Sequence, residues 1–400
     1  MSPVGIAVIG ASKRSTMVIN YLKNHPDVGF ITGIYDVVPQ AAELYVNHFE
    51  LADAKIYSSL DECVNDPDAA AVFIGSADGA HREPVEKSLA VGKHVYCEKP
   101  MAITLEDCDA IIDAAQAASS VFYLGMNLRH NPVHELLHNI MTSGELGRIL
   151  TIEANEYYYG GRTYFRRWNR LRKYGGGLWI TKASHDFDLL NWFSQGRATR
   201  VYATCSLSHY KTIEGAGPNC RVCAIKDTCK DFYDINNADN ALWDKQAAVH
   251  EKVSGVPRDI CLFNSDKDTF DNGIAVVDFA NDVRATYTCN VVSARDTRQM
   301  RLMGTDGAAE GDVSSGLVTV WKRHCDEKRT IDVSEQMKSG HGGADDRIMA
   351  DFFRCCVTGD NPRSSWADGR ASLELGLAAT ESCDKGVPIT LGQDRADLRK

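Results

Sequence analysis

The sequence predicts an α/β protein with two domains, a parallel doubly wound domain at the N-terminus and a second α/β domain after it. Short apolar runs alternate with helix-length segments through the first 125 residues, which is the pattern of βαβ units. Alternating strands and two amphipathic helices follow in the C-terminal half. The chain has 400 residues, more than one hydrophobic core usually organises. We therefore predict a first domain over residues 1–127 and a second over 128–400.

Composition excludes several classes of partner. Hydrophobic residues make up 44% of the chain and charged residues 24%, as in soluble globular proteins. The net charge of −10 disfavours nucleic acid and anionic membranes as partners. No apolar run reaches the ~20 residues that span a bilayer, and the apolar residues 4–9 lack the charged leader of a secretory signal. The 13 scattered cysteines suit a reducing compartment, so we expect a cytoplasmic protein.

The first 36 residues predict a dinucleotide-binding unit. An apolar strand over residues 4–9 leads into a loop that opens with Gly10, followed by a helix over 16–23. A second apolar strand over 31–35 ends at Asp36. A carboxylate at this position accepts hydrogen bonds from an adenosine ribose and repels a 2′-phosphate, which favours NAD over NADP. The alternative is that Asp36 only caps a turn.

The loop after the first strand departs from the usual glycine fingerprint. Gly10 is present, but Ser12 and Ser15 stand where the second and third glycines would be. Serine is still small enough for a pyrophosphate to approach the helix N-terminus. Lys13 and Arg14 could also reach a phosphate, which leaves NADP open as the lesser alternative.

The alternation continues with strands over 70–74, 94–97 and 121–124 and helices over 81–91 and 104–118. Ligands of such sheets bind beyond the carboxyl ends of the strands. The polar residues expected at these ends are Ser76, His81, Glu98, Lys99 and Asn127. His81 could equally be no more than a residue at a helix start.

Two separate stretches each supply a group that can move a proton. Lys99 follows the strand over 94–97, and His185 comes after the glycine run 175–177. A lysine beside a dinucleotide site and a histidine from a second domain are what hydride transfer from an alcohol carbon needs, because the hydroxyl proton must leave as the hydride does.

At this point the chain resembles the Gfo/Idh/MocA oxidoreductases, which include glucose-fructose oxidoreductase and inositol dehydrogenase. The resemblance covers nearly the whole chain. It is carried by residues 92–100 (GKHVYCEKP), 125–129 (GMNLR), 143–147 (SGELG), the run from 175 to 188, and Gly304-Thr305.

The resemblance implies a fold and a set of roles. The fold is an N-terminal Rossmann domain and a C-terminal α/β domain with an open, mostly antiparallel sheet that often builds dimers or tetramers. The resemblance also implies that Lys99 contacts the nicotinamide ribose and the substrate hydroxyl, and that His185 is the acid/base. The aspartate and glycine of the family's Asp-x-Gly-x-His pattern fall here on Thr181 and Ala183. Lys182 could take a role that standard members lack, or it could be a buried lysine paired with Asp186 or Asp188.

A basic, aromatic stretch precedes the glycine run. Residues 157–173 hold six cations and six aromatic rings, which suits an anionic or heavily hydroxylated sugar. We assign Arg166, Arg167 and Tyr159 to the substrate, and Trp168 to the cofactor because the family places a Trp or Arg in this loop against it. For Arg170, Arg172 and Lys173 a solvated charged face is the better prediction.

The cysteines of the middle region raise the possibility of a metal. Cys220, Cys223 and Cys229 form a C-x2-C-x5-C pattern, and Cys261 follows 32 residues later. Four thiolates at such spacing can hold a structural zinc ion. The alternative is a compact insert with reduced cysteines, and an iron–sulfur centre is the least favoured.

The C-terminal half predicts sheet strands over 274–279, 284–289 and 300–303, with a hairpin turn at Asn281-Asp282. Amphipathic helices follow over 345–357 and 371–383, and these last helices could pack back on the first domain. His341 lies in a glycine-rich turn for which a solvent loop is expected, with a contact to the pocket as the alternative.

Three hypotheses for function remain. The first is an NAD-dependent oxidoreductase that takes a hydride from a secondary hydroxyl of an anionic sugar, glycoside or cyclitol. The second is a redox-neutral glycoside hydrolase, which would oxidise a uronic or sulfonated sugar transiently, eliminate the aglycone, add water and restore the alcohol. The third, an NAD-binding regulator without activity, is disfavoured because Lys99 and His185 are both present.

Overall fold

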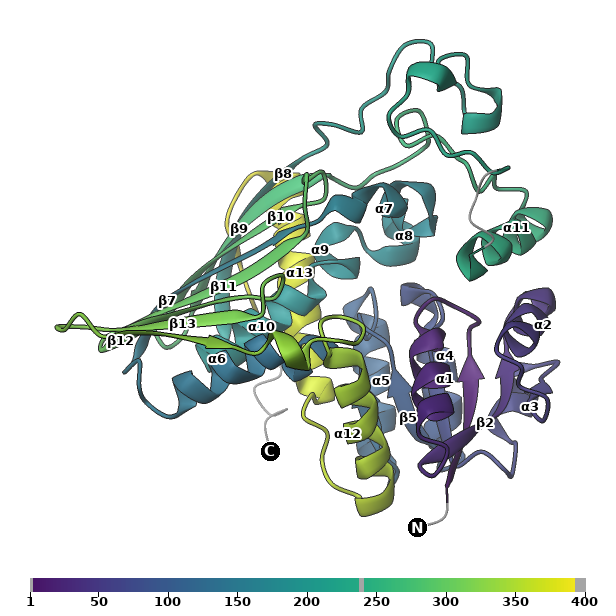
Figure 1. Cartoon of the computed structure of the whole chain (residues 1–400), viewed down its shortest axis with the longest axis horizontal. Helices are drawn as coiled ribbons and strands as arrows, with labels where there is room; N and C mark the ends of the chain where they lie inside the picture. Colours follow the sequence, from purple (N-terminus) through teal and green to yellow (C-terminus); the bar gives the residue numbers. More distant parts are fainter. Residues whose placement is uncertain (1–2, 237–240, 393–400) are drawn as a thin grey trace.

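The computed structural model describes residues 3–236 and 241–392. Two sheets stand side by side, with helices between and around them (Figure 1). This confirms the predicted α/β fold class. Within the described residues, no helix is long and apolar enough to cross a membrane.

The N-terminal sheet has six strands in the order β3-β2-β1-β4-β5-β6, and every neighbouring pair is parallel. The strand order reverses between β1 and β4, which places the ligand crevice at their carboxyl ends. The strands are β1 (Val4–Ile9), β2 (Gly29–Tyr35), β3 (Lys55–Ile56), β4 (Ala71–Ile74), β5 (His94–Cys97) and β6 (Phe122–Leu124). The helices are α1 (Ser15–Asn24), α2 (Pro39–His48), α3 (Leu60–Val64), α4 (Arg82–Ala90) and α5 (Leu105–Ala117).

The second sheet has nine strands in the order β14-β13-β12-β11-β7-β10-β9-β8-β15. Only the pair of β7 and β10 is parallel, and the other pairs are antiparallel. The strands are β7 (Ile149–Tyr157), β8 (Ala198–Ser206), β9 (Asn272–Phe279), β10 (Arg284–Asn290), β11 (Thr297–Gly304), β12 (Gly307–Asp312), β13 (Leu317–Lys322), β14 (Lys328–Asp332) and β15 (Ile389–Thr390). Residues 280–283 turn between β9 and β10, as the sequence predicts.

Helices cover one face of this second sheet (Figure 1). The long helix α13 lies against β8 and α10. Alternation along the strands leaves the other face partly apolar and exposed, with Tyr202, Ile274 and Val276 each more than two-fifths accessible. The helices are α6 (Pro132–Thr142), α7 (Arg162–Arg166), α8 (Arg172–Gly175), α9 (Leu178–Thr181), α10 (Ser184–Ser194), α11 (Leu242–Ser254), α12 (Ala344–Thr358) and α13 (Trp366–Lys385).

The two parts share their cores. The apolar face of α12 places Ile348 and Phe352 in one cluster with Ile6 and Val8 of β1. Leu373 of α13 and Ile180 of α9 belong to the cluster that contains Val72 of β4. Burial of these side chains stabilises each sheet against the other part of the chain. The relative position of the two sheets is therefore fixed by apolar packing.

A buried ion cluster crosses the same boundary. Arg129, in the short 3-10 turn after β6, donates to both carboxylate oxygens of Asp188 on α10, at 2.9 and 2.7 Å. Its guanidinium also lies 3.1 Å from Asp368 on α13. The side chains of Arg129 and Asp188 are only 5% and 2% exposed, so each charge depends on the other for compensation.

We expect Arg129→Met to lower the free energy of unfolding by about 3 kcal/mol, because the change leaves Asp188 buried without its cation. Burial raises the pKa of Asp188 to about 6 against the opposing effect of Arg129. Loss of Arg129 raises that pKa further, and a protonated carboxyl is neutral, so the loss of stability should be smaller at pH 5 than at pH 7.5. Urea titrations at both pH values measure this.

The matched control is Arg200→Met, which removes an exposed arginine paired with Asp278. It should cost at most about 1 kcal/mol. Equal losses for the two variants would contradict the assignment of Arg129 as a buried anchor.

Candidate active site

The loop after β1 has the geometry of a phosphate-binding turn. Gly10 has φ +90°, and a Cβ there would approach the carbonyl oxygen of Gly75 and the nitrogen of Ser76 to 2.9 Å. The hydroxyl of Ser15 donates to the carbonyl of Gly10 at 2.5 Å, and Ser12 lies 3.3 Å from Ser15 between their hydroxyls. The serines therefore brace the turn internally.

Asp36 ends β2 beside this loop. Its carboxylate accepts the amide of Ala11 and that of Val38, both at 2.8 Å. The turn-capping interpretation is thus part of its role. Each carboxylate oxygen has further acceptor capacity, so these two bonds are compatible with a ribose hydroxyl as an additional partner.

Arg14 is committed to protein carboxylates. Its guanidinium lies 2.9 Å from Glu98 and 3.2 Å from Asp345 on α12. The amide of Asn127 donates to the same Asp345 at 2.7 Å. A cation already paired with two carboxylates is poorly placed to bind a 2′-phosphate, which weakens the NADP alternative.

His341 is next to the proposed acid/base. It has φ +49°, its Nδ1 lies 3.0 Å from Asp345, and its ring centroid is 6.1 Å from that of His185. The expectation of a plain solvent loop is therefore wrong, although the side chain keeps some exposure. The glycines that surround it let the turn deliver the imidazole to the site.

His81 is structural in its contacts. It is 1% exposed, its Nδ1 lies 2.9 Å from the carbonyl of Pro100, and its Nε2 lies 3.4 Å from that of Ser76. Both ring nitrogens thus face backbone carbonyls, and burial lowers its pKa. His81 braces the ends of β4 and β5. Ser76 itself donates to the carbonyl of Ala80 at 3.3 Å.

Lys99 links the two halves of the site. Its Nζ donates to the carbonyl of Thr181 at 2.7 Å, across to α9. Burial lowers the pKa of Lys99, and the negative charges of Asp78 and Glu98 oppose this. Asp78 lies in a 3-10 turn after β4, and burial raises its pKa to about 7. The threonine that replaces the family's aspartate also hydrogen-bonds Asp78 through its side chain.

Lys182 is held in its protonated form. Its Nζ lies 2.5 Å from Glu156 on β7 and 3.9 Å from the centre of the Tyr158 ring. Burial alone would lower its pKa, but Glu156 outweighs burial and holds the pKa above its ordinary value. The alternative of a buried, paired lysine holds for the burial but not for the partner, because Asp186 contacts Arg298 and Tyr287 and Asp188 contacts Arg129.

His185 begins α10 deep in the site, where it is 6% exposed. Burial lowers its pKa well below the ordinary value, and the charges of Lys99 and Arg298 add to the effect. Its imidazole is therefore neutral at pH 7. Within the described chain its Nδ1 has no hydrogen-bond partner, and the same holds for Asn127 Oδ1 and Asp78 Oδ2.

These unpartnered atoms test whether the residues fit a dinucleotide. Buried polar atoms are nearly always hydrogen-bonded, so unpartnered ones near strand ends indicate a polar ligand. Asp78 and Asn127 follow β4 and β6, at the carboxyl edge of the parallel sheet where a nicotinamide nucleotide binds in such folds, and His185 comes from α10. The residues present fit the cofactor that the sequence predicts.

The basic stretch is distributed differently from the prediction. Arg166 donates to the carbonyls of Asp231 and Ile260, so it holds the segment between β8 and β9 rather than a substrate. Tyr159 is 54% exposed and carries Arg162 over its ring. Arg167 is exposed, and its charge acts on Lys13. Trp168 packs near Gly175 and is half-buried.

The prediction of a solvated charged face holds for one arginine of the stretch and fails for another. Arg170 is buried and donates to Asp266 at 2.9 Å, so that prediction is wrong for it. Arg172 pairs with Asp384 at the surface, as expected.

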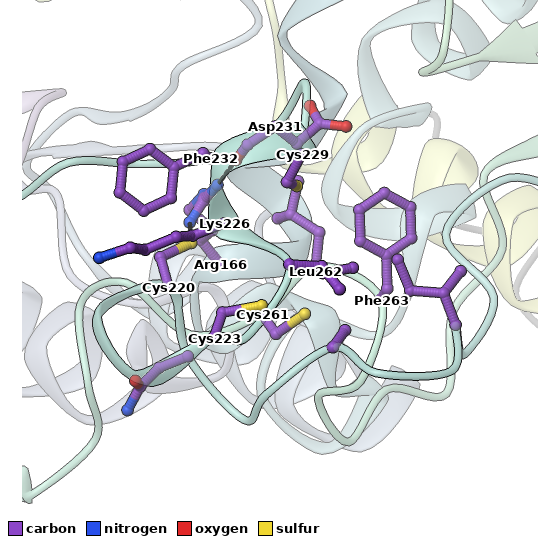
Figure 2. Close-up of a pocket in the computed structure, with 14 residues that line it drawn as sticks. Arg166, Cys220, Cys223, Lys226, Cys229, Asp231, Phe232, Cys261, Leu262 and Phe263 are labelled. Carbon is purple, nitrogen blue, oxygen red and sulfur yellow. Dashed lines mark hydrogen bonds between the residues drawn. The ribbon is translucent and has the colours of Figure 1, made fainter.

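The four cysteines do not form a metal centre. Cys220, Cys223, Cys229 and Cys261 line one small pocket together with Arg166 (Figure 2). Across the described residues, however, no group of three or more His, Cys, Asp or Glu side chains is arranged to hold a metal ion. The structure therefore does not support the zinc alternative, and the four cysteines are free, as in the alternative of a compact insert with reduced cysteines.

Comparison with known proteins agrees with this geometry. Residues 4–126 match the model of an oxidoreductase family with an NAD-binding Rossmann fold, and residues 134–310 match the model of the GFO/IDH/MocA C-terminal domain.

The chain belongs to the Gfo/Idh/MocA oxidoreductase family.

Relatives of this NAD-binding oxidoreductase span most of its length. YteT of Bacillus subtilis is 27% identical over 81% of this chain and 82% of its own. The myo-inositol 2-dehydrogenase of Thermotoga maritima is also 27% identical, over 96% of this chain and 98% of its own.

Solved structures share the fold. Levoglucosan dehydrogenase in complex with NADH and levoglucosan has a TM-score of 0.77 at 17% identity, covering 98% of this chain and 100% of its own. The WlbA dehydrogenase of Bordetella pertussis, in complex with NADH and UDP-GlcNAcA, has 0.73 at 19%, covering 98% and 99%.

Several site residues escaped sequence reasoning. Asp78, Glu156 and Tyr158 are close to the proposed proton-transfer groups only through the fold. Asp78 sits at a strand end where polar residues were expected, so its position offered a signal. Glu156 faces the site through its place in β7, a strand that sequence analysis did not identify.

We expect Asp78→Asn to shift the rising limb of the pH profile of kcat/KM to lower pH. The carboxylate of Asp78 raises the pKa of Lys99, so its removal lets burial lower that pKa further. More of the neutral amine is then present at a given pH. Initial rates between pH 6 and 10 measure the shift, with the exposed Asp68→Asn as control. A limb that stays in place or moves to higher pH would show that Asp78 does not act on Lys99.

Proposed function

We propose that this protein is an NAD-dependent dehydrogenase that oxidises a secondary hydroxyl of a sugar, glycoside or cyclitol. The observation that carries the proposal is the placement of two proton-transfer groups from different parts of the chain: a half-buried Lys99 bonded to Thr181, and a buried, neutral His185 on which the charge of Lys99 acts. The bound nicotinamide would accept the hydride. The protein must then take the hydroxyl proton, and both side chains can do so.

The two groups have complementary roles. Burial lowers the pKa of Lys99, so its neutral amine is more available as a base than that of an ordinary lysine. The hydrogen bond from Lys99 to the carbonyl of Thr181 fixes the position of Nζ. The unpartnered Nδ1 of His185 provides a second acceptor for the proton. The proposed cofactor contacts are the loop residues Gly10, Ser12 and Lys13, then Asp36, Glu98 and Asn127.

An imbalance of charge behind the site supports an anionic substrate, because Lys182 and Arg298 share Glu156 and burial raises the pKa of Asp186, the other acid beside Arg298, to about 7. Lys182 and Arg298 both lower the pKa of His185, which means that they act on the space around it. The ring of Tyr158 covers one side of the Lys182 ammonium and holds it in place. A carboxylate or sulfonate on the sugar would complement this potential. A uronic acid is the proposed substrate class.

The redox-neutral glycoside hydrolase remains the second candidate. It needs a base that removes a proton from the carbon next to the transient ketone. Lys182 cannot supply that base, because Glu156 keeps it protonated. The role would fall to Lys99 or His185, and the two functions are distinguished by whether reduced cofactor accumulates.

The exposed face of the nine-stranded sheet supports a homo-oligomer, a dimer or tetramer as the family resemblance implies. Tyr202 and Val276 are cross-strand neighbours on β8 and β9, and Ile274 extends the same apolar row. Light scattering on the purified chain measures the state.

The deciding experiment follows absorbance at 340 nm with excess NAD and a panel of uronic, sulfonated and neutral glycosides and inositols. We expect NADH to accumulate in proportion to an oxidised product identified by mass. Lys99→Ala should abolish it while NAD binding persists. Release of aglycone that depends on NAD without net NADH would establish the hydrolase and overturn the dehydrogenase.

Substitution of Lys182 tests the charge of the substrate. We expect Lys182→Met to raise KM for uronic substrates by about tenfold relative to their neutral analogues, since ~1.4 kcal/mol of charge-assisted binding corresponds to that factor. Lys173→Met is the control, because Lys173 lies in the same basic stretch and its ammonium lies over the ring of its neighbour Tyr174. Equal effects on charged and neutral substrates would contradict an anion-binding role.

A further inference from the structure

The segment between β8 and β9 carries a helix that lies on the dinucleotide domain. Helix α11 extends from this insert and lies against α2 of the first part (Figure 1). Leu242, its first residue, is 5% exposed and belongs to the apolar cluster of Ile6 and Tyr45. Val249 packs against the same cluster. The helix is thus anchored in the core of a domain that its own segment does not belong to.

The anchored helix touches the turn that follows β1. The amide of Gln246 contacts the carbonyl of Ala11, and the hydroxyl of Tyr45 lies 3.4 Å from the Gln246 side-chain oxygen. The ring of Trp243 lies 5.2 Å from Nζ of Lys13. Two successive turns of the helix therefore meet the proposed phosphate-binding loop.

The next turn of the helix carries His250. Burial raises the pKa of Asp36, at the end of β2, and His250 is among the groups that oppose this rise. Asp36 and the loop residues 11–13 are the groups that hold the adenosine half of a dinucleotide in such folds. Trp243, Gln246 and His250 occur at intervals of three and four residues, so they share one face of α11.

We infer that α11 forms the outer wall of the adenosine half of the dinucleotide site and slows release of the cofactor, with Trp243, Gln246 and His250 as its contact face. The inference rests on the proposed NAD-dependent function. A Trp ring can stack on a base, and a Gln amide can hydrogen-bond its edge. The adenosine would be held between the strand edge of the first sheet and α11.

Contacts within the insert hold this helix in place. Arg166 ties the insert to the segment before the glycine run through the carbonyls of Asp231 and Ile260. Figure 2 shows Arg166 beside the four cysteines and Phe232, which fill the centre of the insert. Arg221 pairs with both Glu251 of α11 and the buried Asp259, and so fixes the helix to this centre. Arg166 is a positioning residue in this arrangement.

The test measures cofactor binding directly in the full-length protein. We expect Trp243→Ala and Gln246→Ala each to raise the dissociation constant for NAD at least tenfold by calorimetry, and to raise the NADH dissociation rate in stopped-flow fluorescence. Trp243→Phe should retain most of the affinity because a ring remains. Val253→Ala, on the exposed face of the same helix, is the matched control and should bind as the wild type does.

A second variant distinguishes direct contact with NAD from support of helix α11. Arg166→Met should weaken NAD binding although its contacts lie in the insert, and KM for the sugar at saturating NAD should stay unchanged. Thermal melts confirm that each variant is folded. Unchanged NAD affinity in the Trp243 and Gln246 variants would overturn the inference, and so would tighter binding, which would mean that α11 obstructs the site. Wild-type protein that binds NAD but oxidises no sugar would refute the proposed function and leave this inference standing.

Discussion

Compensation of buried charge is the constraint on which the junction between the two sheets depends. Lysine and arginine side chains enter this junction from both parts of the chain, and an isolated charge there would cost several kcal/mol. Three of them are paired with acids from other elements: Arg129 with Asp188, Arg14 with Glu98 and Asp345, and Lys182 with Glu156. These pairs specify one relative placement of the elements. Apolar packing of α12 on β1 then supplies the favourable free energy that charge pairing alone does not.

Compensation of buried charge also gives the two lysines of the site different protonation behaviour. Lys182 has a carboxylate at 2.5 Å and two tyrosine rings around it, so it remains charged. Lys99 has a carbonyl as its close partner, and the acids near it oppose burial only in part. A carbonyl accepts a hydrogen bond from either the ammonium or the amine, so it does not lock the charge. One lysine is thereby suited to hold an anion, and the other to exchange a proton.

Sequence patterns predicted the first domain well because its strands are buried on both faces and read as continuous apolar runs. The strands β1, β2, β4, β5 and β6 fall within a residue or two of the predicted ranges. Strands such as β7 and β8 alternate polar and apolar residues and end without strong turn signals, and they were missed. The partner of Lys182 could not be named for the same reason. Glu156 comes from β7, whereas local reasoning could consider only acids that follow Lys182 within a few residues.

The residues of the site likewise divide into those that the sequence could place and those that it could not. Lys99, His185 and Asn127 could be placed from sequence because each follows a recognisable strand or glycine run. Arg166 could not, because its partners are backbone carbonyls of residues 231 and 260, which carry no signature of their own. Counting charges in one stretch assigned Arg166 to the substrate and Arg170 to a solvated face, whereas in the structure Arg166 holds an insert and Arg170 is buried against Asp266.

The loss of the family's aspartate at Thr181 has a physical consequence for the proton. An aspartate there would place a negative charge beside Lys99 and raise its pKa. Thr181 instead offers its carbonyl to Lys99 and hydrogen-bonds Asp78, whose pKa burial raises to about 7. The negative charge near Lys99 is thus moved to a group that itself titrates near neutrality. Below that pH the carboxyl of Asp78 is neutral and no longer favours the ammonium form of Lys99, and above it the carboxylate does. The site keeps an acid near its lysine, but one whose influence depends on pH.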